Sequence, residues 1–394
     1  QEDDRRLAAI AAPFNPVTGE GSIGERVEVK IKDMPSTPIM WLPVEMMDNE
    51  FIKQLLAAKT IKNFMRRKRW EYTEENIDYV IEAFIRVRIQ YDFPFWAALF
   101  VIIQDKISGR LVKFILNRPQ RQLISMLEDM RKAGMPIRLV LLKARQWGGS
   151  TAVQIYMAWL HLVLTVGHSS AIVAHQKKAS YGVRNMLKRP IEHYPVRLVH
   201  ALGEGYKPGE PIITGTPSPN VISIKSRQCE VEVGSAENPD SERSANTYLV
   251  HLTEVAFWKS TENKDPGDIV RSVCSGVLLQ PLTLIVYEST ANGTGNFFQE
   301  EYDAAKSGES NFRALFIAWW QIEMYSLPFK DEDERSDFAV WLYKNRNNAN
   351  VPDNRHEPGK YLWRLFEMGA TLEAIHWYVV KRSEYHSHAG MAAE

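Results

Sequence analysis

The sequence predicts an α/β fold in which a mainly parallel β-sheet is flanked by helices on both faces. From Phe114 onward, short apolar runs of strand length alternate with helical stretches, a pattern typical of parallel sheets with crossover helices. At 394 residues the chain is long enough for one large domain and a smaller accessory part. Hydrophobic residues make up 45% of the chain and charged residues 24%, as in ordinary globular proteins.

The elements are predicted in chain order from their patterns. Residues 1–50 are rich in Pro and Gly and are expected to form a loop or arm. Helices are predicted over residues 49–69 and 76–88, with Thr73 as a helix N-cap. The predicted strands cover residues 137–143, 170–174, 221–224, 230–234, 248–252 and 282–287, and the predicted helices among and after them cover residues 150–166, 177–189, 331–346 and 371–386.

This pattern divides the chain into three parts. We expect an N-terminal arm and helical region over residues 1–110, the α/β core over 111–320, and a small helical, lid-like subdomain over 321–394.

Charge and cysteine content narrow the class of protein. The 48 basic and 48 acidic residues balance, which argues against a wholly basic coat for nucleic acid but allows a local basic face. Such a local cluster lies between Lys59 and Arg69, although a solvated helix face is the ordinary explanation for it. The two cysteines, Cys229 and Cys274, form no disulfide framework or zinc-binding spacing, which fits a reducing compartment. No membrane span is predicted, because the longest apolar stretch, residues 93–103, is too short.

The most informative segment is residues 143–151, KARQWGGST, between the predicted strand 137–143 and the helix from Ser150. Strand, glycine-rich turn and helix form the context of a phosphate-binding loop, in which backbone amides and the helix N-terminus bind phosphate oxygens. The usual motif has Gly first and Lys before the Ser or Thr, whereas here Lys143 is first and Gly149 takes the lysine position. Lys143 is the preferred phosphate-binding cation, Arg145 is the other nearby one, and a tight Gly-Gly turn is the alternative interpretation.

Two later segments place polar groups at strand ends. Glu254 follows an apolar strand, where a carboxylate faces the ligand-binding edge of a parallel sheet and can act as a general base. For this segment taken alone, a polar residue that simply ends the strand is the favoured alternative. The residue before it is Thr253, which carries no charge with which to hold a metal ion. The strand at 282–287 leads to residues 288–293, ESTANG, whose hydroxyl and amide groups suit a γ-phosphate sensor; a simple polar turn is the alternative.

Taken in order, KARQWGGST, LTEVAFW and ESTANG resemble the ATPase core of tailed-phage large terminases, the motors that package DNA into capsids. The similarity covers about residues 114–298 and, more loosely, the remainder of the chain. The resemblance implies a P-loop NTPase fold of the additional-strand type, with ATP and Mg²⁺ as ligands. It also implies that Lys143, at the start of the loop, replaces the usual lysine.

The resemblance assigns roles residue by residue. Glu254, Lys143, Arg145 and Arg243 are the expected catalytic residues, with Arg243 matching an arginine donated to a neighbouring subunit. A salt bridge within its loop is the alternative for Arg243. Gln120 is the expected adenine-recognition residue, with Gln122 as the fallback. The remaining expected residues bind ATP (Lys143, Ala144, Arg145, Gln146, Trp147, Gly148, Gly149, Ser150 and Thr151), hold the metal ion (Ser150 and Glu254) or couple hydrolysis to movement (Ser289, Thr290, Asn292 and Gly293).

The resemblance also implies partners and a place of action. These are double-stranded DNA, a portal protein, a small terminase subunit and four further copies in a pentameric ring on the portal. The ring is expected in the host cytoplasm, on the assembling virion but not in the mature particle. The chain ends where the linker to the family's nuclease domain would begin, and its acidic run at 331–334 is better explained as a solvated face. We therefore expect ATP hydrolysis without DNA cleavage.

Other functions remain open at this stage. A helicase or another nucleic-acid translocase would share the same core. A nucleotide-binding module with a decayed site is suggested by Gly149 and Thr253, and a portal or capsid adaptor is a further alternative.

Overall fold

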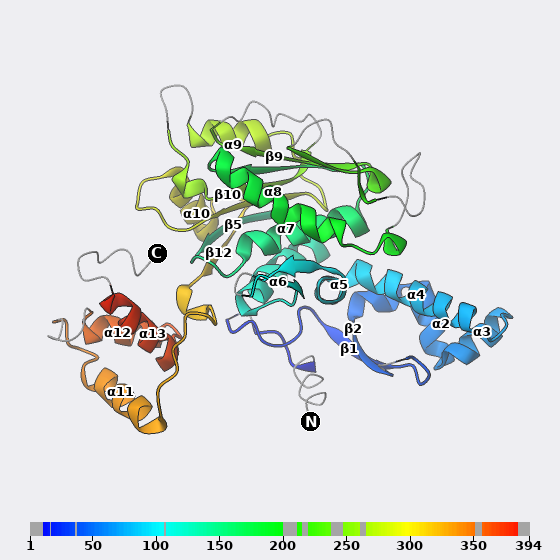
Figure 1. The fold of residues 1–394 in the computed structure, drawn as a ribbon, viewed down its shortest axis with the longest axis horizontal. Coiled ribbons are helices and arrows are strands. Elements are labelled where there is room, and N and C mark those ends of the chain that lie inside the picture. Colours follow the sequence, from blue (N-terminus) through cyan, green and yellow to red (C-terminus); the bar gives the residue numbers. More distant parts are fainter. Residues whose placement is uncertain are drawn as a thin grey trace.

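The computed structural model describes residues 11–15, 17–35, 38–105, 108–199, 211–214, 220–237, 247–260, 265–350 and 357–384. Its centre is a sheet whose eight described strands lie in the order β12 (Arg313–Ile317), β5 (Ile137–Lys143), β11 (Leu284–Ser289), β10 (Thr247–Thr253), β6 (Ser169–Ala174), β9 (Cys229–Ser235), β8 (Val221–Ile224) and β7 (Ile213–Thr214). Strands β12 to β9 pair in parallel, while β8 pairs antiparallel with β9 and β7 (Figure 1). The predicted mainly parallel sheet is confirmed.

The strand order also identifies the type of α/β fold. One strand, β11, lies between β5, which leads into the glycine-rich loop, and β10, which ends just before Glu254. An inserted strand at this position is the feature that the additional-strand prediction requires. All three strands run in the same direction, so their carboxyl ends meet at one edge of the sheet, where ligands of open α/β sheets bind.

Helices cover both faces of the sheet. Alternate residues of each strand point to opposite faces, so Leu139 and Leu141 join one apolar core while Val140 joins the other. The first core is closed by α5 (Phe93–Phe100), α6 (Arg118–Lys132), α7 (Gly149–Trp159) and α8 (Lys177–Glu192), and the second by α9 (Pro266–Cys274) and α10 (Phe297–Ser307).

Helix α7 differs from its prediction at both ends. It begins at Gly149, and at Trp159 it passes into a π-helical segment, Leu160–Leu164, in place of a continuous α-helix to residue 166. The buried Arg227 guanidinium donates to the carbonyl oxygens of His161 and Thr165, which have no partner within the helix because the helix ends at Leu164. Sequence periodicity does not report such a change of helix type.

The N-terminal region is more ordered than the loop or arm predicted for it. Strands β1 (Arg26–Lys30) and β2 (Ile39–Pro43) form an antiparallel hairpin. The guanidinium of Arg26 donates to both carboxylate oxygens of Asp92, at 2.9 and 2.8 Å, and Arg88 donates to one of them at 3.1 Å. Burial alone would raise the pKa of Asp92, but the two arginines hold it below its ordinary value. This ion-pair cluster attaches the hairpin to the helices that follow.

The helix predicted over residues 49–69 is two helices, α2 (Glu50–Ala58) and α3 (Ile61–Lys68). Lys59 has a left-handed backbone, φ 63°, and the Thr60 hydroxyl accepts from the Asn63 amide as an N-cap, so the chain turns between them. The predicted cap at Thr73 is confirmed at the start of α4 (Glu74–Tyr91), where its hydroxyl accepts from the Asn76 amide. A second hairpin, β3 (Ile102–Gln104) and β4 (Leu111–Lys113), leads to the core.

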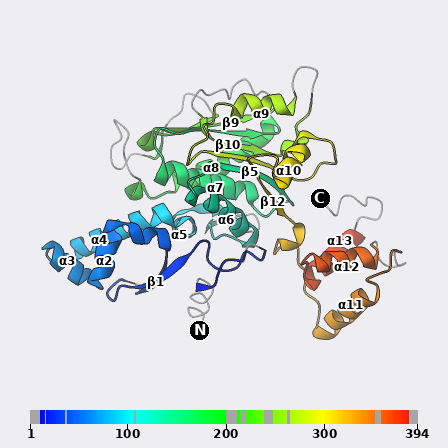
Figure 2. The same ribbon diagram turned by 180° about the vertical axis from the view of Figure 1, so that it is seen from behind.

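The C-terminal part is a helical appendage set apart from the sheet, as Figures 1 and 2 show. It contains the two predicted helices, now α11 (Glu332–Lys344) and α13 (Leu372–Ser383), and an unpredicted one, α12 (Gly359–Glu367). These three helices share a small apolar core that includes Phe338, Leu362 and Tyr378. Among the described residues, no helix combines the length and the apolar character needed to cross a bilayer.

Candidate nucleotide-binding site

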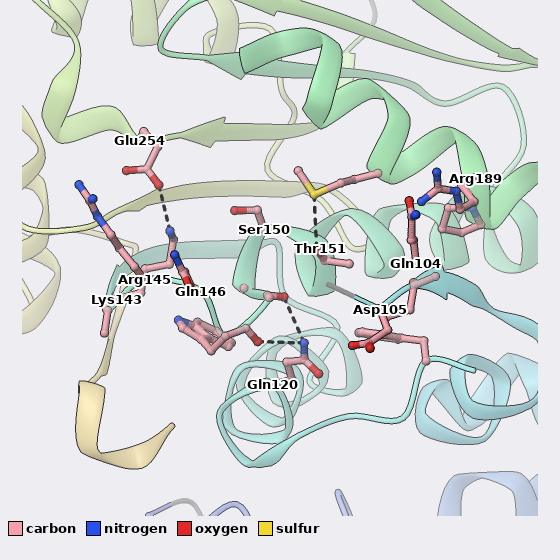
Figure 3. A pocket seen from close by; sticks show the side chains of 18 of the residues that line it. Gln104, Asp105, Gln120, Lys143, Arg145, Gln146, Ser150, Thr151, Arg189 and Glu254 are labelled. Atoms are coloured by element: carbon pink, nitrogen blue, oxygen red, sulfur yellow. Dashed lines mark hydrogen bonds and ion pairs between the residues drawn. The ribbon is translucent and has the colours of Figure 1, made fainter. Parts of the chain in front are cut away.

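A cleft of about 770 Å³ opens at the carboxyl ends of β5 and β10 and above the first turn of α7. Its lining includes the whole predicted loop, residues 143–151, together with Gln120 and Glu254. Figure 3 shows Lys143, Arg145 and Glu254 at one end of the cleft and Gln104, Asp105 and Arg189 at the other, with Ser150 and Thr151 between them. The fold thus gathers residues that are up to 154 positions apart in the sequence, from Ile103 to Phe257.

Lys143 and Glu254 form the central contact of the cleft. The Lys143 Nζ lies 3.1 Å from Glu254 Oε1, and the lysine side chain is buried while that of Glu254 is 29% exposed. Burial by itself lowers the pKa of Lys143, but the carboxylates of Glu288 and Glu254 outweigh it and raise the pKa above its ordinary value. Lys143 is therefore positively charged at neutral pH and points into the site from the end of β5.

The backbone at Glu254 sets the direction of its side chain. Its φ is 55° and its ψ 42°, a left-handed conformation that non-glycine residues seldom adopt, and a 3₁₀ turn, Val255–Phe257, follows directly. Such local strain is typical of residues held for a function. The turn is held from the neighbouring strand end, where Ser289 Oγ accepts from the Ala256 amide at 3.1 Å.

Three of the four residues predicted to couple hydrolysis to movement, Ser289, Thr290 and Asn292, contact Glu254 or this turn. Thr290 Oγ1 lies 3.5 Å from Glu254 Oε2, and Asn292 Nδ2 donates to the Ala256 carbonyl oxygen at 2.9 Å. Gly293 has a φ of 72°, which lets the loop turn toward α10. The ESTANG segment is therefore bonded directly to the segment that positions Glu254.

The glycine-rich loop is braced from α6. The Asn117 and Gln120 side chains both donate to the Trp147 carbonyl oxygen, and Gln120 Nε2 also donates to that of Gly148, at 3.0 to 3.2 Å. Gln120 Oε1 accepts from the Asn117 amide in a capping box. Gln120 thus acts on the loop backbone in this structure, and its contact with an adenine base stays a prediction. Gln122 instead donates to the Val17 carbonyl oxygen in the N-terminal segment.

The position of Gly149 explains why the usual lysine is absent from it. The buried Trp147 ring lies over Gly149, and a Cβ built there would be 2.6 Å from the ring. Gly148 has a φ of 78°, and a Cβ on it would be 2.7 Å from Gln120 Nε2. No side chain fits at either glycine without moving its neighbour, which leaves no room for a lysine at position 149. The assignment of the phosphate-binding cation to Lys143 stays a prediction.

The other predicted loop residues have distinct environments. The Ala144 amide bonds the Ile317 carbonyl oxygen, and the Arg145 carbonyl oxygen accepts from the Tyr325 hydroxyl at 2.9 Å. Gln146 is exposed and has a φ of 68°. Ser150 Oγ donates to Glu288 Oε1, while Thr151 Oγ1 contacts Met186 Sδ at 3.4 Å. Since Gly149 and Ser150 open α7, their amides have no partner within the helix and are suited to bind an anion.

Sequence reasoning missed Glu288, the first residue of ESTANG. It is fully buried, and its Oε1 lies 3.4 Å from His251 Nε2 as well as accepting from Ser150. Burial would raise its pKa, but Lys143 in particular lowers it to about 2. A carboxylate inside an otherwise apolar strand was the available signal. The predicted Arg243 lies outside the described residues, and its role stays a prediction.

Comparisons with known proteins give structural neighbours only. No family model and no curated sequence matches the chain. The chain is similar to the HK97 bacteriophage large terminase (16% identity, TM-score 0.46), with 64% of this chain covering 51% of that one. It is also similar to the Thermus phage P74-26 large terminase ATPase domain (20% identity, TM-score 0.31), with 55% of this chain covering 84% of that one. A third similar structure is S. cerevisiae Dbp5 bound to Gle1 and IP6 (12% identity, TM-score 0.34), with 59% of this chain covering 54% of that one.

The chain therefore spans about half the length of the HK97 large terminase, and most of the length of the P74-26 ATPase domain. Each of these three TM-scores is below 0.5, so these similarities assign no function to the chain.

Proposed function

We propose that this chain is an ATP-hydrolysing motor of the phage large-terminase kind, which moves double-stranded DNA into a procapsid. The observation that carries the proposal is the meeting of Lys143, Glu254 and the first turn of α7 in one cleft. A charged lysine, a carboxylate and helix-terminal amides are the groups that binding and hydrolysis of a nucleoside triphosphate require.

The residues divide the reaction between them. Lys143 and the amides at Gly149 and Ser150 would bind the phosphates. The Ser150 hydroxyl, with Thr151 in support, offers hard oxygen donors of the type that Mg²⁺ prefers. Mg²⁺, when bound, would neutralise charge on the phosphate oxygens. Glu254 would orient and activate the attacking water.

The Lys143–Glu254 ion pair gives the site a resting state. While Lys143 Nζ is 3.1 Å from Glu254, the carboxylate is engaged by the lysine. A phosphate group competes for Nζ because it is also an anion, and its binding would release Glu254 toward water. The other end of the cleft, where Gln104, Asp105 and Arg189 lie (Figure 3), is where the nucleoside would lie.

The partners belong to the same proposal. Packaging must accept any DNA sequence, so the grip should act on the phosphate backbone. The exposed residues Arg66 to Arg69 at the end of α3 form one candidate surface. A pentameric ring on the portal, a small terminase subunit, an Arg243 that acts across subunits and action in the host cytoplasm follow from the sequence resemblance.

The first test is steady-state Mg²⁺-ATP hydrolysis, with and without linear double-stranded DNA, for the wild type beside Lys143→Ala and Arg145→Ala. Loss of a stabilising group of this kind costs about 10²–10³-fold in turnover, and we expect that loss for Lys143→Ala. Equal turnover in the wild type and Lys143→Ala would move the phosphate-binding cation to Arg145. No turnover in the wild type would favour the decayed-module alternative, and strand separation on forked DNA would favour a helicase.

A further inference from the structure

The residue that precedes the proposed catalytic carboxylate leaves a charge missing. P-loop NTPases hold the metal ion with the loop Ser or Thr and with an aspartate at the end of a neighbouring strand. Here Thr253 occupies the strand end before Glu254, and its hydroxyl carries no charge. The site therefore lacks one negative group at the position where the fold ordinarily supplies it.

Glu288 lies directly beside that position. Thr253 and Glu288 are register partners in the parallel pairing of β10 with β11, and paired residues point to the same face of a sheet. Lys143 leaves β5 on this face too, because Glu288 pairs with Leu141, two residues before it. The carboxylate missing at Thr253 is thus present one strand away, on the strand inserted between β10 and β5.

The contacts of Glu288 point toward the phosphate loop. Its Oε1 accepts from Ser150 Oγ. Its side chain has no exposed surface, and within the described parts of the chain its Oε2 has no hydrogen-bond partner. A buried carboxylate oxygen without a partner is costly unless a ligand or water satisfies it.

The bond from Ser150 also fixes what the hydroxyl can do. A serine hydroxyl has one proton and two lone pairs. With its proton donated to Glu288, Ser150 can only accept or coordinate on its remaining side, which lines the cleft. Glu288 therefore prepares Ser150 as an oxygen ligand.

We propose that Glu288 replaces the absent strand-end aspartate as the carboxylate of the Mg²⁺–nucleotide site. It holds Ser150 in the ligand orientation and supplies the negative charge beside it. This inference rests on the proposed ATPase function, since it assigns a residue to the same site. Glu288 is a positioning residue, because it would act on the metal through Ser150.

A purely structural role for Glu288 would be to balance the buried charge of Lys143, whose pKa it helps to raise. The two roles differ in what they predict for nucleotide binding. Charge balance alone would make loss of Glu288 destabilising, with no effect on how strongly Mg²⁺ promotes binding. A role at the metal would weaken that Mg²⁺ dependence specifically.

The test is the affinity for a fluorescent, non-hydrolysable ATP analogue, measured in excess Mg²⁺ and in EDTA, for the wild type and Glu288→Gln. Partners of metal ligands typically change metal affinity by about 10–100-fold. We expect Glu288→Gln to lose about tenfold or more of the Mg²⁺-dependent gain while keeping its affinity in EDTA. Glu288→Asp keeps the charge but moves it away from Ser150. This variant should retain the fold and lose part of the Mg²⁺-dependent gain in affinity. Thr253→Asp combined with Glu288→Gln should restore it.

Glu128→Gln is the matched control. Glu128 is also a buried carboxylate, but it pairs with Arg131 and Tyr156 on α6 and α7, away from the cleft. It should lower stability and leave the Mg²⁺ dependence of binding unchanged. An unchanged Mg²⁺ dependence in both Glu288 variants would overturn the inference and leave the ATPase proposal standing. Failure of the wild type to bind the analogue at all would overturn both.

Discussion

Lys143 and Glu254 lie 111 residues apart in the sequence, yet the lysine Nζ is 3.1 Å from the glutamate Oε1, across a sheet in which β11 separates their two strands. The contact joins the end of β5 to the end of β10, the two positions from which phosphate binding and water activation are expected. In the proposed mechanism, an anionic ligand would have to separate this ion pair.

Replacing Glu254 by Gln should separate binding from turnover. The amide keeps the size of the side chain but cannot accept a proton, so hydrolysis should fall by about 10²–10⁴-fold, with affinity for ATP retained or increased. Steady-state hydrolysis and equilibrium binding of labelled ATP measure the two effects. Glu323→Gln, which alters an exposed carboxylate paired with Arg118, is the control and should change neither. Parallel loss of binding and turnover would contradict the role of Glu254 as a base.

A methyl group at Gly149 should disturb the loop. The added Cβ would lie 2.6 Å from the Trp147 ring, and overpacking of a buried contact costs about 1–3 kcal/mol. Urea unfolding of Gly149→Ala measures the loss. The matched control is Gly182→Ala, because Gly182 lies exposed within α8 with nothing within 4 Å of its Cβ position. That variant should be neutral or stabilised by up to about 1 kcal/mol. Equal effects at the two glycines would remove the steric explanation for the displaced lysine.

The buried Glu288 predicts a specific acid dependence of stability. Its pKa falls on folding from 4.5 to about 2, so its ionised form stabilises the folded state above pH 4.5. That contribution, on the order of 3 kcal/mol, is lost as the pH falls through 4.5 toward 2. Since Gln does not titrate, the unfolding free energies of the wild type and Glu288→Gln should differ most at neutral pH and converge only as the pH falls to about 2 and below. A difference that stays constant between pH 7 and pH 3 would contradict this charge assignment.

Loss of the Asn292 side-chain amide should uncouple ATP hydrolysis from its stimulation by DNA. Asn292 donates to the Ala256 carbonyl oxygen in the turn after Glu254, so Asn292→Ala removes a direct link between the loop and that turn. We expect basal hydrolysis to stay within about fivefold, since one neutral hydrogen bond contributes about 1 kcal/mol, while the stimulation by DNA is lost. Hydrolysis rates over a DNA titration measure both. Retention of full stimulation would exclude Asn292 from coupling.

The sequence predicted those parts of the site that depend on local pattern. A strand, a glycine-rich turn and a helix are adjacent in the chain, so the loop at 143–151 and its displaced Lys143 could be predicted from the sequence. Glu254 could be predicted for the same reason, since it directly follows an apolar strand. The inserted strand was also predicted, because the order of the three motifs along the chain resembles that of large-terminase ATPase cores, which have an additional strand.

Features that depend on contacts between residues far apart in the sequence could not be predicted from it. Glu288 becomes a site residue only through its register with Thr253 and its contact with Ser150, 138 positions away. The Arg26–Asp92 pair, which anchors the N-terminal hairpin, spans 66 positions. The division between α2 and α3 was missed for another reason. The N-cap at Thr60 is a local signal, but the helical periodicity continues across it and predicted a single helix.

The Tyr325 hydroxyl, which bonds the Arg145 carbonyl oxygen, belongs to a ring that stacks on Trp377 of α13 with centroids 4.6 Å apart. The backbone of the phosphate loop is thereby joined through a single tyrosine to an indole in the helical appendage. A displacement of the loop changes the stacking of that indole, and with it the polarity around the ring that determines its emission. We therefore expect a ligand in the cleft to change the intrinsic tryptophan fluorescence, and we expect Tyr325→Phe to abolish the part of that change that comes from Trp377.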